Sequence, residues 1–265
     1  MLKKQLDKHD VEFQILNLDA KIPSKSSIIL TTFDDLDKSE LKKHNNYLVY
    51  SKKQDFKRYL IKVIAAFRIG YKKFYSRLTF SIDPGKKLGL MIFLDDYYLE
   101  SYCCFEPGDL HVIIKQYYET FQEDNPKLMF LDFKLGRGVL PIAFTLVEQI
   151  YNNFYDRKNM RVLLIDEFKS SKIRISANHA SRKFTKDEIS ALVLTFRNGI
   201  LVNISNYKSI FQQLGNKKLN AGKLKQVKSN NNDESLFDLR KVIIKVLNGE
   251  LDIISATKIL NPIEP

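Results

Sequence analysis

Four carboxylates stand where apolar segments of this chain end or begin, and we take them as candidate catalytic residues: Asp83, Asp132, Asp187 and Glu188. Carboxylates gathered in one place repel one another, so such a group makes chemical sense around hard cations that take oxygen ligands, namely Mg²⁺ or Mn²⁺. We expect Asp83, Asp132 and Asp187 to be the metal ligands. Two such ions about 4 Å apart can hold a phosphate group and activate water for in-line attack on it.

The positions of the acids along the chain predict that they meet. The apolar segment Leu78–Ile82 runs directly into Asp83. The short apolar segment Leu128–Leu131 reads as a strand that stops at Asp132. If these two strands are neighbours, their carboxyl ends bring Asp83 and Asp132 together, and a crossing helix adds Asp187.

The middle of the chain carries the elements that must position these acids. Three strands separated by turn residues predict an antiparallel meander: Leu78–Asp83, Leu88–Leu94 and Tyr97–Phe105. We then expect a helix over 109–121, the strand 128–131, a loop over 133–138, a helix over 139–151, the strand 162–165 and a helix over 185–197. Thr185 and Glu188 have the spacing of a capping box. The order β-β-β-α-β-α-β-α predicts an α/β fold with a mixed sheet, in one domain over 77–214.

The flanking regions predict three further parts. Residues 1–72 read as a small α/β domain, which ends in an amphipathic helix over 55–69 with Gly70 as its C-cap. Residues 216–233 are poor in apolar residues and rich in lysine, which indicates a flexible basic linker. Residues 235–265 form a short helical segment. Its apolar spacing fits either docking of a protein partner through 235–260 or packing on the main domain.

Composition bounds the partners and the compartment. The 265 residues carry 43 basic and 31 acidic side chains, a net charge of +12 that favours nucleic acid, although much of the lysine can also be solvated surface. Cys103 and Cys104 are adjacent, so we expect two thiols rather than a disulfide. No apolar run is long enough for a membrane span, and the start is too polar for a signal peptide. We expect a cytoplasmic protein.

Three segments together resemble a known family. The first is Asp83-Pro84-Gly85 with Gly89, the second is Lys134-Leu135-Gly136-Arg137-Gly138-Val139, and the third is the helix Asp187–Leu194. In this order they resemble the RuvC-like branch of the RNase H-like superfamily, the Holliday-junction resolvases and their relatives, over residues 77–198. The second acid of that family is usually glutamate, whereas here it is Asp132. The fourth acid falls on Ser190, and Glu188 lies on the same helical turn.

The resemblance implies an RNase H-like mixed sheet and a metal-dependent endonuclease that acts on DNA, including branched or junction DNA, in recombination and repair. It also implies a symmetric dimer. Basic residues around the acids are the expected contacts to nucleic acid: Lys86, Lys134, Arg137, Lys169, Lys172, Arg174, Arg182 and Lys183. The glycines beside Arg137 would let a backbone approach closely.

Two other readings stay open. A non-catalytic nucleic-acid-binding protein on the same fold is motivated by Ser190 and by the unassigned flanking regions. An ATPase of the actin-like or sugar-kinase type is motivated by Asp83-x-Gly85 as a first phosphate loop and by Gly136-x-Gly138 after Asp132 as a second. Those ATPase folds need two such domains, and the residues after position 77 are too few for them.

Overall fold

The structure is a computed structural model that describes residues 1–9, 11–17, 20, 28–38, 46–123, 125–167, 183–221 and 233–261. The chain divides into two compact units. The first comprises Met1–Tyr75 together with Lys115–Pro126, and the second comprises Ser76–Ile114 together with Lys127–Pro265. Four predicted nucleic-acid contacts lie outside the described residues: Lys169, Lys172, Arg174 and Arg182.

The first unit holds a two-stranded parallel sheet, β1 (Ile29–Thr32) with β2 (Tyr47–Tyr50), and the helices α1 (Leu2–Lys8), α2 (Phe33–Lys38) and α3 (Phe56–Ile69). Its buried cluster is centred on Leu6, Tyr59 and Val63. The helix over 56–69 follows its prediction, with the Asp55 carboxylate accepting from the Lys57 amide at the start and Gly70 at the end. We did not expect α1, which forms because Leu2 and Leu6 share one face and reach this cluster.

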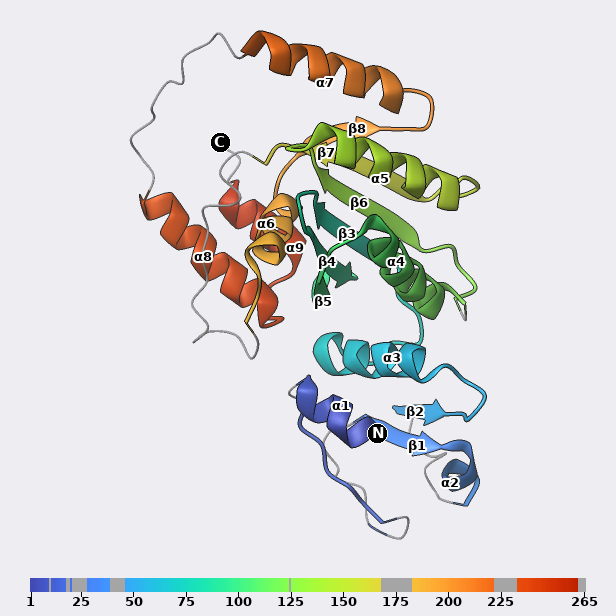
Figure 1. Ribbon diagram of the computed structural model, residues 1–265. Coiled ribbons are helices and arrows are strands. Elements are labelled where there is room, and N and C mark those ends of the chain that lie inside the picture. Colours follow the sequence, from blue (N-terminus) through green and yellow to red (C-terminus); the bar gives the residue numbers. More distant parts are fainter. Residues whose placement is uncertain are drawn as a thin grey trace. The chain divides into compact units, whose positions relative to one another are not determined.

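The second unit is built on a six-stranded mixed sheet, in the order β5-β4-β3-β6-β7-β8 among the described residues (Figure 1). The strands are β3 (Arg77–Asp83), β4 (Leu88–Leu94), β5 (Tyr97–Cys104), β6 (Phe130–Gly136), β7 (Met160–Ile165) and β8 (Gly199–Val202). β4 is antiparallel to β3 and β5, β6 is parallel to β3 and β7, and β8 is antiparallel to β7. The predicted meander and the mixed α/β class are therefore confirmed.

Helices cover both faces of this sheet (Figure 1). On one face, Ile82 of β3 lies with Leu110 of α4 (Pro107–Gln122) and Leu146 of α5 (Leu140–Asn153) around one small cavity. On the other face lies α6 (Lys186–Thr195), whose apolar residues pack on Met91 and Phe93 of β4. The capping box predicted at the start of α6 is present. Later in the chain, α7 (Tyr207–Ala221) packs on α5 through the rings of Tyr207 and Phe211, which contact Phe144 of α5.

The C-terminal segment is part of the second unit. Its two helices, α8 (Asp233–Leu247) and α9 (Ile253–Leu260), contribute Val242, Ile243, Val246, Ile253 and Ala256 to the buried cluster that contains the apolar side of α6. The apolar face that suggested docking of a protein partner through 235–260 is therefore covered by the chain itself. This is the second of the two arrangements that the sequence left open.

Two predicted boundaries are wrong. The strand expected over 128–131 is β6, which extends through Gly136, so the expected loop over 133–138 is mostly strand. The linker expected from 216 does not begin there, because α7 continues to Ala221. The rest of that linker, 222–232, lies outside the described residues.

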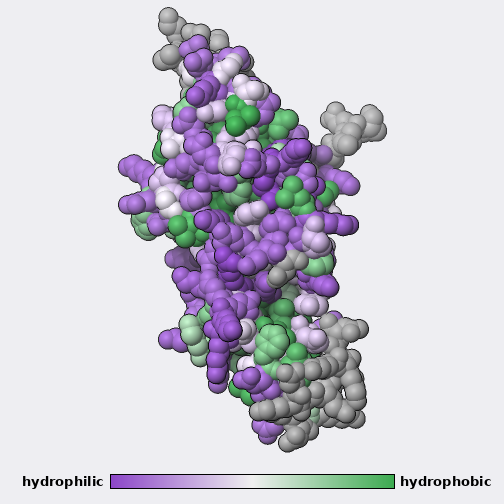
Figure 2. Space-filling view, turned by 90° about the vertical axis from the view of Figure 1, so that its right-hand side faces the viewer, coloured by the Kyte–Doolittle hydropathy of each residue, from purple (hydrophilic) through white to green (hydrophobic). Residues whose placement is uncertain are grey.

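The face shown in Figure 2 is covered mainly by hydrophilic residues, with scattered hydrophobic areas between them. Among the described residues, no helix combines the length and the apolar character that crossing a membrane requires.

Candidate functional site

Asp83 ends the central strand β3 between two glycines. On one side Gly89 of β4 is its register partner. On the other side Ile82 pairs with Leu135, so the next residue of β6, Gly136, runs alongside Asp83. The hydroxyl of Ser81 donates to the carbonyl of Ala191 in α6 at 2.6 Å, so Ser81 points to the face of the sheet that α6 covers. Because side chains alternate along a strand, residues 77, 79 and 83 of β3 point to the same face. The Asp83 carboxyl therefore lies beneath the start of α6.

The two glycines admit the segments that carry the other acids. A Cβ on Gly89 would lie 2.0 Å from the carbonyl oxygen of Asp187, so only glycine lets the first turn of α6 lie this close to β4. A Cβ on Gly136 would lie 2.1 Å from a carboxylate oxygen of Glu167, which follows β7. The amide of Gly138 donates to that carboxylate at 2.7 Å. Asp187 and Glu167 thus approach Asp83 from opposite sides.

Electrostatics bear out this grouping. Burial, and after it the negative charges of Glu167 and Asp187, raise the pKa of Asp83 from 3.8 to about 7. A hydrogen bond from the Ser190 hydroxyl and the positive charge of Lys186 act in the opposite direction. A proton on Asp83 or a bound cation would lower the negative charge that the three carboxylates bring together.

Asp187 lies where the sequence predicted it, in the first turn of the helix that crosses over β3 and β4. Its carboxylate is 3.9 Å from the thiol of Cys103, which is the register partner of Gly89 on β5. Asp83, Gly89 and Cys103 therefore form one row across three strands, with Asp187 above the middle of the row. Cys103 and Cys104 are both thiols, as expected.

Glu188 does not join this group. It is the N3 residue of α6, and its carboxylate accepts from the Thr185 amide at 2.7 Å and from the Ser101 hydroxyl at 2.9 Å. The Thr185 hydroxyl in turn accepts from the Glu188 amide. The side chain is buried and engaged in capping the helix, so the prediction that Glu188 assists Asp187 is not supported by its placement.

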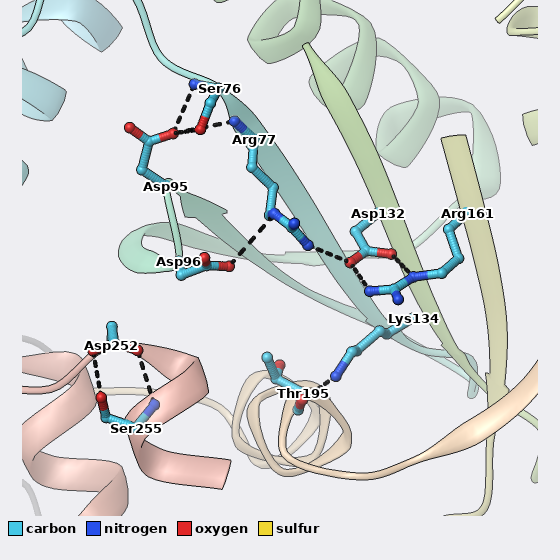
Figure 3. Close-up of polar contacts among 10 residues, drawn as sticks. All are labelled: Ser76, Arg77, Asp95, Asp96, Asp132, Lys134, Arg161, Thr195, Asp252 and Ser255. Atoms are coloured by element: carbon cyan, nitrogen blue, oxygen red, sulfur yellow. Dashed lines mark hydrogen bonds and ion pairs between the residues drawn. The ribbon is translucent and has the colours of Figure 1, made fainter. Parts of the chain in front are cut away.

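Asp132 does not lie beside Asp83, and the prediction that it does is wrong. Its register partner on β3 is Thr79, four residues before Asp83, which separates the two acids by about 13 Å along the strands. The Asp132 carboxylate forms a two-point ion pair with Arg161, one contact being 2.7 Å, and lies 3.4 Å from Arg77 (Figure 3). The side chain of Asp132 is 4% exposed, so Asp132 is a buried partner of two arginines.

Lys134 is also placed differently from its prediction. It lies inside β6 rather than in a loop, and its ammonium donates to the carbonyl of Thr195 at the end of α6 (Figure 3). Burial lowers the pKa of Lys134 to about 8, while the nearby Asp132 opposes that shift. A buried amine that binds a helix carbonyl is not placed to contact phosphate, so Lys134 holds the last turn of α6 on the sheet.

The remaining predicted basic residues lie at the same end of the sheet as Asp83. Lys86 is exposed in the turn between β3 and β4, and Lys183 is exposed just before α6. Arg137 lies between Gly136 and Gly138 and forms an ion pair with Asp166 at 2.6 Å. Two further basic residues near the acids were not expected from the sequence. The charge of Lys186 acts on Asp83, and the guanidinium of Arg197 donates to the carbonyl of Asp166 at 2.7 Å.

The acid that sequence reasoning missed is Glu167. Its signal was present, because Asp166-Glu167 directly follows the buried strand that became β7. The apolar run 128–131 before Asp132 is the more conspicuous signal, and it points to the wrong acid. Among the residues that the structure describes, no three His, Cys, Asp or Glu side chains are arranged to hold a metal ion. The acids face one another around Asp83 without forming a closed set of ligands.

No family model, curated protein or solved structure matches this chain. The site itself must therefore carry the functional argument.

Proposed function

We propose that this chain is a metal-dependent endonuclease on an RNase H-like fold that acts on DNA, with Asp83, Glu167 and Asp187 as its acidic residues. One observation carries the proposal. Asp83 ends the central strand, and its pKa is raised to about 7 by burial and by the charges of Glu167 and Asp187. Such a shift is typical of functional carboxylates, because gathering acids around a buried carboxyl group costs stability.

The architecture supports the superfamily part of the proposal. Over 77–195 the elements run β-β-β-α-β-α-β-α, and the first and fourth strands of that series, β3 and β6, are neighbours in the sheet. The helix that closes the series brings its first turn over the end of the first strand. These are the relations that the resemblance to the RuvC-like branch implies. Glu167 follows β7 and lies against Gly136, and in this proposal it takes the role of the second acid that the sequence assigns to Asp132.

The donor set fits Mg²⁺ or Mn²⁺, since it consists of carboxylate oxygens with surplus negative charge. Mg²⁺ commonly uses one or two carboxylates and completes its shell with water and substrate phosphate, so a preformed cage of three side chains is not required. The bound ions would neutralise charge on the phosphate and activate water. Asp83 would be held in orientation by the Ser190 hydroxyl, and Glu167 by the amide of Gly138.

The substrate class follows from charge. The chain carries a net charge of +12, and the exposed Lys86 and Lys183 lie at the end of the sheet where the acids gather. A polyanion would be drawn to this end, and the carboxylates would repel it unless cations were bound. Nucleic acid is such a polyanion, and its phosphates can also bind the cations that the carboxylates hold.

A non-catalytic nucleic-acid-binding protein is the second candidate, and the absence of a closed ligand set among the described acids favours it. The geometry does not favour an ATPase. Its second phosphate loop needed Asp132 next to Gly136-x-Gly138, but Asp132 is paired with Arg161 near the opposite end of β6. The glycine turn contacts Glu167 instead.

The test is a cleavage assay with labelled four-way junction, flap, duplex, single-strand and RNA–DNA hybrid substrates, in Mg²⁺ and in Mn²⁺. We expect metal-dependent cleavage by the wild-type chain that is lost in Asp83→Asn. Tight, salt-sensitive binding without cleavage of any substrate would favour the non-catalytic candidate. Neither binding nor cleavage would overturn both.

A further inference from the structure

An exposed aromatic ring lies at the mouth of the proposed site. Phe105 immediately follows β5, and its side chain is 69% exposed although it is large and apolar. The last residue of β5, Cys104, is the register partner of Leu88, next to Lys87. Phe105 therefore lies two residues beyond Cys103 of the Asp83–Gly89–Cys103 row, at the end of the sheet where the acids gather.

One ammonium group contacts the ring, and a second exposed lysine precedes it in the same turn. The Nζ atom of Lys87 lies 4.8 Å from the centroid of the Phe105 ring, which is a cation–π contact. Lys86 and Lys87 are both exposed in the turn that begins at Pro84, directly after Asp83. A flat apolar face and two cations are thus combined within a few residues of the carboxylate that would meet the scissile phosphate.

This combination has a chemical counterpart in an unpaired nucleotide. Bases stack on exposed aromatic rings whatever their identity, while the phosphates of the same strand pair with nearby lysines. A base inside an intact duplex has both faces covered by its neighbours and cannot stack in this way. We propose that Phe105, Lys86 and Lys87 form a binding site for one unpaired nucleotide beside the proposed nuclease site. This inference rests on the proposed function and narrows its substrate to nucleic acid with an unpaired base near the scissile bond.

The test measures binding without cleavage. A short, fluorescently labelled oligothymidylate is titrated with the full chain in EDTA, and its anisotropy gives the dissociation constant. Phe105→Ala should weaken binding by about 5- to 150-fold, the range that stacking on one aromatic ring spans. Phe105→Tyr keeps a ring and should bind like the wild type, which also excludes misfolding as the cause. Tyr155→Ala is the matched control, because Tyr155 is 71% exposed beyond the opposite end of α5.

Further arms define the ligand. An oligomer with abasic sites should bind the wild type as weakly as the intact oligomer binds Phe105→Ala, and duplex binding should not change in Phe105→Ala. Equal affinity of Phe105→Ala and wild type for the single strand, or no measurable single-strand binding by the wild type, would overturn the inference.

The same titration separates this inference from the proposed function. Asp83→Asn should retain Phe105-dependent binding, since Asp83 does not belong to the stacking site. If binding depends on Phe105 but no substrate is cleaved in any metal, the nuclease proposal fails and the nucleotide site stands. If cleavage depends on Asp83 but Phe105→Ala binds normally, the nucleotide site fails and the nuclease proposal stands.

Discussion

Gly89 lies directly beneath the main chain of Asp187, so that a Cβ at position 89 would be 2.0 Å from the Asp187 carbonyl oxygen. This contact fixes the height of α6 above the sheet, and with it the approach of Asp187 to Asp83. The position of an acid in the proposed site is thereby set by a glycine on a different strand.

Gly89→Ala tests this relationship. The added methyl group must displace the first turn of α6, which we expect to lower the free energy of unfolding by about 1–3 kcal/mol, as overpacking in a well-packed interior does. Urea denaturation measures the change. Gly108→Ala is the control, because a Cβ on Gly108 in the first turn of α4 meets no atom within 4 Å. Equal stability of Gly89→Ala and wild type would show that α6 is not held at this height.

The raised pKa of Asp83 predicts a pH-dependent effect of its removal. Asp83 binds a proton more tightly in the folded chain than in the unfolded one, so its contribution to stability is complete below pH 3.8 and is lost as the pH rises through about 7. Asp83→Asn should therefore be more stable than the wild type at pH 8, by on the order of 2 kcal/mol, and should lose that advantage near pH 4. Urea denaturation at both pH values measures the difference, and an advantage independent of pH would contradict the assignment.

Cation binding should reverse the destabilisation at alkaline pH. Adding Mg²⁺ or Mn²⁺ at pH 8 neutralises the carboxylates only in the folded chain, where they are gathered, so the midpoint of unfolding of the wild type should rise. Asp83→Asn should respond much less. The same rise in both proteins would place the bound cation elsewhere.

Asp132 is predicted to matter for stability. Asp132→Asn leaves Arg161 and Arg77 without their carboxylate, and we expect a loss of about 2 kcal/mol. This is below the cost for fully buried pairs, since the two arginine side chains are 41% and 35% exposed. Asp166→Asn is the matched control: the Asp166 side chain is 61% exposed, against 4% for Asp132, so its ion pair with Arg137 should contribute less than about 1 kcal/mol. An Asp132→Asn variant as stable as the wild type would contradict this role.

Glu167 is predicted to be a cation ligand. Glu167→Gln removes a charge yet keeps an oxygen that can accept from the Gly138 amide, so the fold should be preserved. We expect its affinity for Mn²⁺, measured by calorimetry, to fall about tenfold or more. Asp166→Asn, which changes the neighbouring acid, should bind Mn²⁺ like the wild type. Equal affinity in Glu167→Gln and wild type would remove Glu167 from the site.

The sequence was sufficient for the central strand and for the closing helix. Asp83 is followed by Pro84-Gly85, which ends a strand reliably, and the capping box at Thr185 fixes where α6 begins. Both signals are local in the chain. Asp83 and Asp187 were accordingly placed correctly.

The second acid could not be placed in the same way. Residues 131–135 alternate apolar and polar side chains, which is a strand pattern, but the apolar run before them suggested that the strand ended at Asp132. Asp132 and Lys134 are polar because they point to the face beneath α6, where Arg161 and the Thr195 carbonyl receive them. Glu167 reaches Asp83 only because Gly136 lies in register beside it, and register is not a local property.

In the proposed nuclease site, Asp83, Glu167 and Asp187 are the acidic residues and Asp132 is not one of them. The most direct experiment compares Mg²⁺-dependent cleavage by four single variants that fold: Asp83→Asn, Glu167→Gln, Asp187→Asn and Asp132→Asn. We expect a loss of at least about 100-fold in the first three variants, and near wild-type cleavage in Asp132→Asn at a temperature where it remains folded. Cleavage that is lost in Asp132→Asn but retained in Glu167→Gln would contradict the proposal.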